Sequence, residues 1–233
     1  MKRAISAIVA TVVVLGLNTA VGQQRIVVTG NRMVVGGYFS SGFSFVAGDG
    51  YEDLSGWPRG DRKAKWAGDG GAYFDFFFTD LIGIEAGLGF RNKGIRFRDG
   101  DVGEKSSIVY MEIPVMAKLT FKGFQAALGL AFLVGLSGKT TTWNEDVDVK
   151  DRWDGDDWQY FHRVNLGPKL VVGYAIPVGP IYIVPGMSWS MHFINDLNND
   201  EIEDLPLVPD DPEYRMRAVN LMFRVAVEWP IPR

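Results

Sequence analysis

Short and long connections alternate along this chain, between segments whose side chains alternate in polarity. Tight reversals fall at Thr79-Asp80, Lys122-Gly123 and Pro177-Val178-Gly179-Pro180. Long polar stretches separate them, at residues 48–65, 99–106, 137–158 and 195–214. An up-and-down β-barrel inserted into a membrane from one side has tight periplasmic turns and longer outer loops. The spacing therefore predicts such a barrel, with three tight turns in the periplasm and four polar loops outside.

Eight segments alternate apolar side chains with small or polar ones, which is the period of a β-strand. They cover residues 33–46, 66–78, 82–91, 108–121, 124–136, 160–176, 181–193 and 219–229. Alternation alone does not decide which face points inward, because a soluble lipocalin-like barrel alternates as well. The polar face is rich in glycine and serine and poor in charge, which suits the crowded interior of a narrow barrel.

We therefore expect an all-β protein, an eight-stranded antiparallel up-and-down transmembrane β-barrel of OmpA/OmpX-like architecture with its apolar face toward lipid. Aromatic residues near the strand ends are candidates for the interfacial girdles of such a barrel. They are Phe78, Phe90, Phe121, Phe124, Tyr174, Trp189 and Trp229.

The N-terminus has the features of an export signal. Lys2 and Arg3 precede an apolar run over residues 4–17, and Ala20-Val21-Gly22 offers small residues for cleavage. A signal anchor is the alternative, but the run is shorter than the ~20 residues of a spanning helix. We expect a signal peptide over residues 1–22, a periplasmic segment over 23–32, the barrel over 33–229 and a C-terminal tail over 230–233.

The composition excludes several classes of site. The chain has no cysteine, which excludes disulfides and thiolate metal sites. Its net charge is −4, and the basic surface of a nucleic-acid-binding protein is missing. We expect no cofactor, no resident metal and no nucleic-acid partner.

A few charged residues fall on the inward face and need partners there. Arg91 and Glu112 lie at similar distances from the connection between their strands, so we predict a cross-strand ion pair. Asp75 and Glu85 meet near a tight turn, where Lys118 of the next strand can neutralise them. These pairs favour a structural plug, and a proton or ion path is the alternative.

The fourth strand resembles a known family. Its segment Tyr110-Met111-Glu112-Ile113-Pro114-Val115-Met116-Ala117-Lys118 is similar to the signature strand of the PorT-like outer-membrane β-barrel family. Further similar positions are Gly129, Gly135, Ser137-Gly138-Lys139, and Gly186-Met187-Ser188-Trp189-Ser190 reaching Asn195. The resemblance spans about residues 34–229. It implies an outer-membrane barrel of a kind common in Bacteroidetes, some of whose members assist the secretion of other proteins.

One arrangement is reminiscent of a hydrolase. Ser188, Ser190 and His192 share a strand face, with Asp196 nearby in sequence, and nucleophilic catalysis needs a serine within reach of an oriented base. That face is the predicted interior, away from lipid substrates. We therefore expect no enzymatic activity, and a lipid-modifying hydrolase is a lesser alternative.

The polar loops carry the remaining candidates. Six acidic residues cluster in one of them: Asp146, Asp148, Asp151, Asp154, Asp156 and Asp157. Their carboxylates could bind Ca²⁺, although they lack the spacing of an EF-hand loop. The alternative is a solvated acidic loop. Trp143, Trp153 and Trp158 lie among them and predict a contact surface. We expect a structural or partner-docking protein of the cell outer membrane, in contact with outer-membrane lipids and lipopolysaccharide and with a protein partner at its loops, in secretion or adhesion. A small porin-like channel is the alternative.

Overall fold

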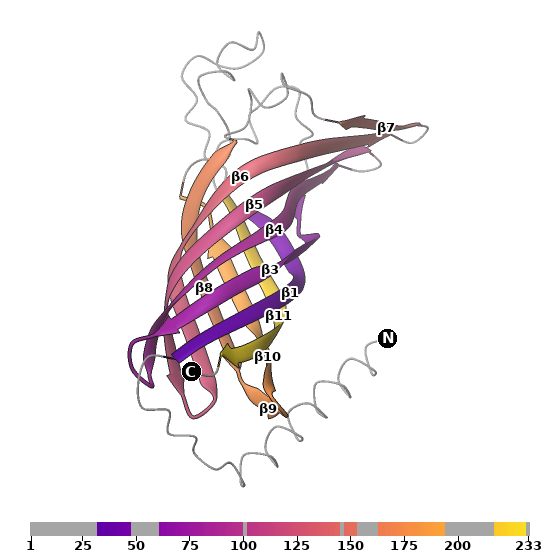
Figure 1. Ribbon diagram of the computed structural model, residues 1–233. Coiled ribbons are helices and arrows are strands. Elements are labelled where there is room, and N and C mark those ends of the chain that lie inside the picture. The colour runs from indigo at the N-terminus through magenta and orange to yellow at the C-terminus, as the bar shows by residue number, and fades with distance from the viewer. Residues whose placement is uncertain are drawn as a thin grey trace.

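The computed structural model describes residues 32–47, 61–99, 102–144, 147–152, 163–193 and 217–231. These residues form one closed antiparallel β-barrel (Figure 1). Eight long strands make the wall: β1 (Arg32–Ala47), β3 (Lys65–Phe77), β4 (Ile82–Asp99), β5 (Val102–Phe121), β6 (Phe124–Asn144), β8 (Val164–Tyr174), β10 (Ile181–Met191) and β11 (Arg217–Ile231). Three short strands extend it: β2 (Asp61–Lys63), β7 (Val147–Arg152) and β9 (Ile176–Val178).

Each wall strand pairs with its neighbours in chain order, and β11 pairs with both β10 and β1. The pairing of β1 with β11 runs without interruption from Met33↔Ile231 to Ala47↔Arg217. The predicted eight-stranded up-and-down barrel is thereby confirmed. Within the described ranges, no helix is long and apolar enough to cross a bilayer.

Tight turns gather at one end of the barrel, here called the turn end. Lys122 and Gly123 have φ of 49° and 86°, the positive pair that a two-residue type I′ hairpin requires. In the turn between β3 and β4, the Thr79 hydroxyl accepts hydrogen bonds from the Leu81 and Ile82 amides, at 3.2 and 2.9 Å. Both chain ends of the barrel lie at this end too (Figure 1).

Two of the polar stretches that were expected to be loops contain paired strands instead. β4 and β5 pair as far as Asp99↔Val102, and β6 continues to Asn144, where β7 pairs with it up to Asn144↔Val147. These hairpins extend beyond the barrel wall at the opposite end, here called the loop end (Figure 1). Strand pairing is made by backbone groups, so it continues where the side chains no longer alternate. Residues 48–60, 153–162 and 194–216 lie outside the described residues.

The last strand is longer than expected. β11 ends at Ile231, and Pro230 and Ile231 pair with Val34 and Met33 instead of starting a tail. Proline is tolerated at the end of a strand, where a missing N–H costs little. The expected signal peptide, residues 1–22, lies outside the described residues, as do residues 232 and 233. The expected periplasmic segment, residues 23–32, is outside them as well except for Arg32, which is the first residue of β1.

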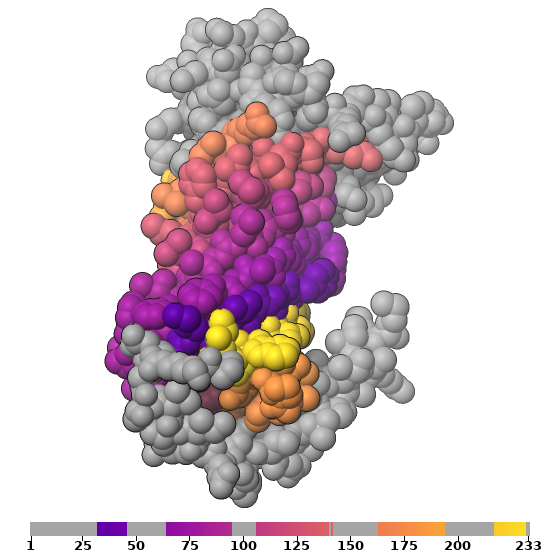
Figure 2. Space-filling view, viewed as in Figure 1, coloured from indigo at the N-terminus to yellow at the C-terminus, as the bar shows by residue number. Residues whose placement is uncertain are grey.

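The two faces of the wall have the expected composition. Phe39, Trp66 and Phe223 are 66%, 63% and 68% exposed on the outer face. Figure 2 shows one side of the barrel in space-filling form. The girdle candidates Phe78, Phe90, Phe121, Phe124 and Trp229 are likewise exposed, and Tyr174 and Trp189 are half-buried. Serine, tyrosine and charged side chains are buried inside.

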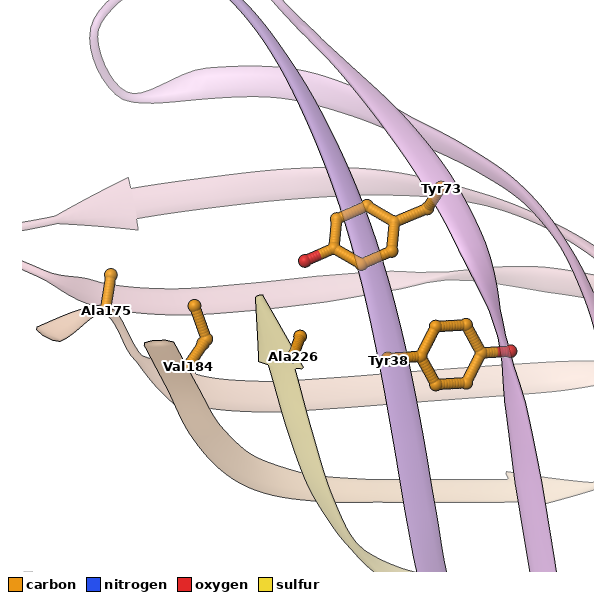
Figure 3. Close-up of a cluster of buried hydrophobic side chains, with 5 residues drawn as sticks. All are labelled: Tyr38, Tyr73, Ala175, Val184 and Ala226. Carbon is orange, nitrogen blue, oxygen red and sulfur yellow. The ribbon is translucent and has the colours of Figure 1, made fainter. Parts of the chain in front are cut away.

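Two tyrosines organise the apolar part of the interior. Tyr38 and Tyr73 lie with ring centroids 6.2 Å apart, in a cluster with Ala175, Val184 and Ala226 (Figure 3). The Tyr73 ring lies over Gly36 of the neighbouring strand, where a Cβ atom would overlap the ring. Glycine at this position therefore makes room for the ring inside a narrow barrel.

Candidate functional site

The barrel interior is lined with charged groups along its length. Among the described residues, eleven aspartate, glutamate, lysine and arginine side chains are buried, six basic and five acidic: Lys65, Asp69, Asp75, Glu85, Arg91, Lys93, Glu112, Lys118, Lys169, Arg224 and Glu228. A buried charge is tolerated where it is paired and hydrogen-bonded. The pairs fall into a central cluster and a turn-end cluster, with a third group toward the loop end.

Arg91 is the hub of the central cluster. Its guanidinium lies 3.1 Å from the Asp69 carboxylate and 2.6 Å from that of Glu112. The other Glu112 oxygen accepts from the Lys169 ammonium. In the strand register Glu112 lies opposite Gly89, two residues from Arg91, so the ion pair is a diagonal one between β4 and β5. The structure thus brings the sequence-predicted pair together.

Lys118 is the hub of the turn-end cluster. Its ammonium lies 2.6 Å from Asp75, 3.1 Å from Glu85 and 2.9 Å from Glu228. Asp75 and Glu85 are direct cross-strand partners, and Lys118 lies on β5 opposite Gly83. The three residues that the sequence grouped together are therefore in contact.

Glu228 is the member of this cluster that sequence reasoning missed. Its carboxylate accepts hydrogen bonds from the Tyr73 hydroxyl at 2.9 Å and the Gln125 amide at 2.8 Å. It lies on β11, more than a hundred residues from Lys118, and reaches Lys118 across the closed barrel. Its inward position on the last strand was visible in the alternation, but no spacing rule identifies a partner across a barrel.

The group toward the loop end is aromatic and basic. The Lys93 ammonium lies 2.8 Å from His192 Nδ1 and 4.7 Å from the centre of the Tyr110 ring, on which the His192 ring also packs edge-on. Lys65 donates to the Ser106 carbonyl at 3.0 Å. His192 is fully buried here.

The serines of the hydrolase-like arrangement have structural contacts. The Ser190 hydroxyl accepts from Arg91 at 2.7 Å and from the Asn220 amide at 3.4 Å. Ser188 and Ser190 are buried in the barrel, as the strand alternation predicted. Ser190 thus adds a hydrogen bond to the Arg91 guanidinium in the central cluster.

The loop candidates are mostly outside the described part of the chain. The backbone of Trp143 lies in β6, opposite Gly103 on one side and Asp148 on the other. Trp153 and Trp158 lie outside the described residues, as do Asp146, Asp154, Asp156 and Asp157. Within the described ranges, no three histidine or acidic side chains come together as a metal site would require.

Paired side chains fill much of the described interior. A cavity of about 10 Å³ lies beside the turn-end cluster, between Glu85, Lys118, Gln125 and Arg224. A space of this size holds about one water molecule. The clusters can therefore brace the wall from inside, because each links three or more strands.

No protein-family model matches the chain, and a search of curated proteins returned no match. Solved outer-membrane proteins are similar in fold. The outer membrane protein AlkL, solved in lipid bilayers, has a TM-score of 0.46 at 11% identity, covering 91% of this chain and 95% of that one. OprG from Pseudomonas aeruginosa has a TM-score of 0.44 at 13% identity, covering 88% of this chain and 97% of that one. The attachment invasion locus protein Ail of Yersinia pestis has a TM-score of 0.40 at 11% identity, covering 87% of this chain and 99% of that one.

Proposed function

We propose that this protein is an outer-membrane β-barrel with a structural and partner-docking role. It is held in lipid by its apolar outer wall, braced inside by ion pairs, and presents its extended β6–β7 hairpin to a protein partner in secretion or adhesion. The observation that carries this proposal is the inversion of polarity across a closed wall. Large apolar side chains cover the outside of the wall, and eleven charged side chains of the described residues are buried inside it.

The apolar exterior supports a place in a bilayer. Neighbouring strands present Phe39, Phe43 and Trp66 outward, with Phe43 and Trp66 packed edge to face at a centroid separation of 5.2 Å. Soluble monomers rarely expose apolar surface on this scale. A closed barrel leaves no free strand edge in the wall, which is what a bilayer demands of a spanning structure. The export signal and the PorT-like resemblance belong to the same proposal.

The interior supports a plug more than a pore. Arg91 and Lys118 each bind at least two carboxylates from other strands, so opening a channel would break several buried ion pairs together. Removing one member of such a pair costs ~3–5 kcal/mol. We therefore propose a non-enzymatic, non-conducting barrel.

Conductance tests the plug. Purified protein inserted into a planar bilayer should give no regular single-channel steps. The double substitution Asp75→Asn with Glu85→Gln serves as the comparison, because it removes two of the carboxylates that bind Lys118. With these ion pairs lost, the variant should conduct more than the native protein. Regular steps from the native protein would establish the porin-like alternative.

Docking is tested by shortening one hairpin at a time. Replacing residues 140–151 by Asn-Gly joins Lys139 to Arg152, which are directly opposite in the register, through a two-residue turn. The matched control replaces residues 97–104 by Asn-Gly between Arg96 and Lys105 of the neighbouring hairpin. Proteins that co-purify from detergent-solubilised outer membranes should be lost with the first change. Unchanged partners, secretion and adhesion in both variants would contradict a docking role.

A further inference from the structure

The sheet at the loop end has a free edge. There β2 pairs with β4, and β5, β6 and β7 follow in order, so the described part of this sheet ends on β7. Figure 1 shows β7 to one side of the barrel wall, at the tip of the β6–β7 hairpin. β2 is three residues long, whereas β7 has six and contains no proline that would prevent further pairing. The backbone of β7 can therefore accept one more strand.

The direction of hydrogen bonding alternates along β7. Asn144 and Val147 pair across a two-residue connection, and the residues that close such a hairpin hydrogen-bond to each other. The odd-numbered residues of β7 therefore direct their backbone N–H and C=O groups toward β6. The even-numbered residues direct theirs to the free edge, and all three are charged: Asp148, Lys150 and Arg152. An added strand has to place its own edge-directed residues opposite these.

The charges at the free edge are complementary to those of the same strand in a second copy. Two copies of β7 related by a two-fold axis pair antiparallel. With the axis at Val149, Asp148 of each copy lies opposite Lys150 of the other. Moving the axis by one residue places Lys150 opposite Lys150, or Asp148 opposite Asp148, and like charges at opposite positions destabilise a strand pair. Moving it by half a residue pairs even-numbered with odd-numbered residues, whose backbone groups do not match.

We infer that the β6–β7 hairpin binds a second copy of this chain, whose β7 pairs antiparallel with this β7 about a two-fold axis at Val149. This inference rests on the docking role proposed above and names the partner. The sheet of one copy then continues into the sheet of the other, and each Asp148–Lys150 pair occurs twice. The interface consists of residues 147–151 of each copy, which is small, so the dimer should dissociate on dilution and at high salt.

Cysteine cross-linking tests this pairing, because the chain contains no cysteine of its own. The two copies of Val149 would form a non-hydrogen-bonded pair with Cα atoms about 4.5 Å apart, which is within the range of a disulfide. The matched control is Val147→Cys, whose two copies would lie four residues apart along the strands, or about 13 Å. Each purified protein is oxidised mildly in detergent micelles and separated on a non-reducing gel.

Val149→Cys should give about tenfold more disulfide-linked dimer than Val147→Cys. An equimolar mixture of Val147→Cys and Asp151→Cys should cross-link as well, because these two positions are opposite each other about the same axis. The shift between folded and unfolded bands on unheated gels shows that each variant barrel is folded. Equal cross-linking of the two single variants would overturn the proposed pairing.

Exchange of the charges tests what selects the partner. In the Val149→Cys protein, Asp148→Lys alone or Lys150→Asp alone should lower dimer formation about tenfold, because two opposite-charge pairs become like-charge pairs. The two substitutions together should restore the dimer, because the opposite charges face each other again with their signs exchanged. A double variant that cross-links no better than the single variants would contradict the inference.

The outcome also separates this inference from the docking role. If Val149→Cys stays monomeric while the shortened β6–β7 hairpin still loses other co-purifying proteins, the partner is a different protein and the docking role alone remains. If Val149→Cys stays monomeric and the shortened hairpin changes nothing, both proposals are overturned.

Discussion

A single ammonium group holds the turn-end cluster together. Lys118 neutralises Asp75, Glu85 and Glu228, which come from three different strands. The geometry follows from alternation, because every one of these residues lies on the inward face of its strand. At the residue scale, we therefore expect the stability of the barrel to depend strongly on a central residue such as Lys118 and weakly on single residues of the outer face.

Loss of the Lys118 charge should destabilise the barrel strongly. Lys118→Met keeps the length of the side chain but leaves three buried carboxylates near one another, at an expected cost of ~3–5 kcal/mol. The free energy of unfolding in urea, measured for the protein in detergent micelles or nanodiscs, checks this value. Lys139→Met, at an exposed position of β6, is the matched control and should change little. A similar stability for both variants would show that the ion pairs do not brace the barrel.

Two adjacent glycines should respond in opposite ways to alanine. A Cβ atom at Gly36 would overlap the Tyr73 ring, whereas at Gly37 its nearest contact is the Gly71 carbonyl at 3.8 Å. Gly36→Ala should therefore cost ~1–3 kcal/mol through overpacking. Gly37→Ala should be neutral or stabilising by up to ~1 kcal/mol, because alanine loses less backbone entropy in a strand. Urea unfolding of the two variants side by side measures the difference, and equal costs would contradict the packing described for Tyr73.

At the scale of elements, the hairpins divide into two kinds. Those at the turn end are closed by short turns, and the β5–β6 turn has positive φ at both Lys122 and Gly123. Those at the loop end, β4–β5 and β6–β7, continue beyond the barrel wall as paired strands. Turn chemistry thus defines one end of the barrel, and the extended pairing supplies the surface at the other.

The β5–β6 turn predicts a stabilising substitution. Asparagine tolerates positive φ better than lysine, so Lys122→Asn should stabilise the hairpin by a few tenths of a kcal/mol and speed barrel formation. Gly123→Val, which forces a β-branched residue to a φ of 86°, should slow it. The shift between folded and unfolded bands on unheated gels, followed during refolding into detergent, measures both rates. Faster folding of Gly123→Val than of the native chain would show that the turn is not formed early.

At the scale of the whole molecule, the inverted polarity of the wall makes a membrane-facing band the central prediction. Trp66 and Trp229 are 63% and 57% exposed on the outer face. In a closed barrel they can be shielded from water only by lipid, detergent or another protein. The proposed membrane location can therefore be tested by measuring whether these two side chains contact lipid.

Fluorescence quenching by brominated lipids measures whether these tryptophan side chains face lipid. Single-tryptophan variants that keep Trp66 or Trp229, with the other tryptophans changed to phenylalanine, should be quenched strongly in bilayers of lipids brominated on their chains. A matched variant with its one tryptophan at Tyr110, inside the barrel, should be quenched little. Weak quenching at both outward positions, in a protein that has folded in the bilayer, would mean that the outer face is covered by protein instead.

The sequence by itself determined the strand faces, the number of wall strands and the end with tight turns, because alternation and turn residues are local properties of the chain. It also grouped Arg91 with Glu112, and Lys118 with Asp75 and Glu85, since these residues lie on strands joined by hairpins.

Only the tertiary structure decided what barrel closure brings together. Glu228 reaches Lys118, and Ser190 reaches Arg91, across about a hundred residues of sequence. The length of the loop-end hairpins depends on backbone pairing between strands. That pairing leaves no periodic trace in the side chains, so it could be read only from the folded chain.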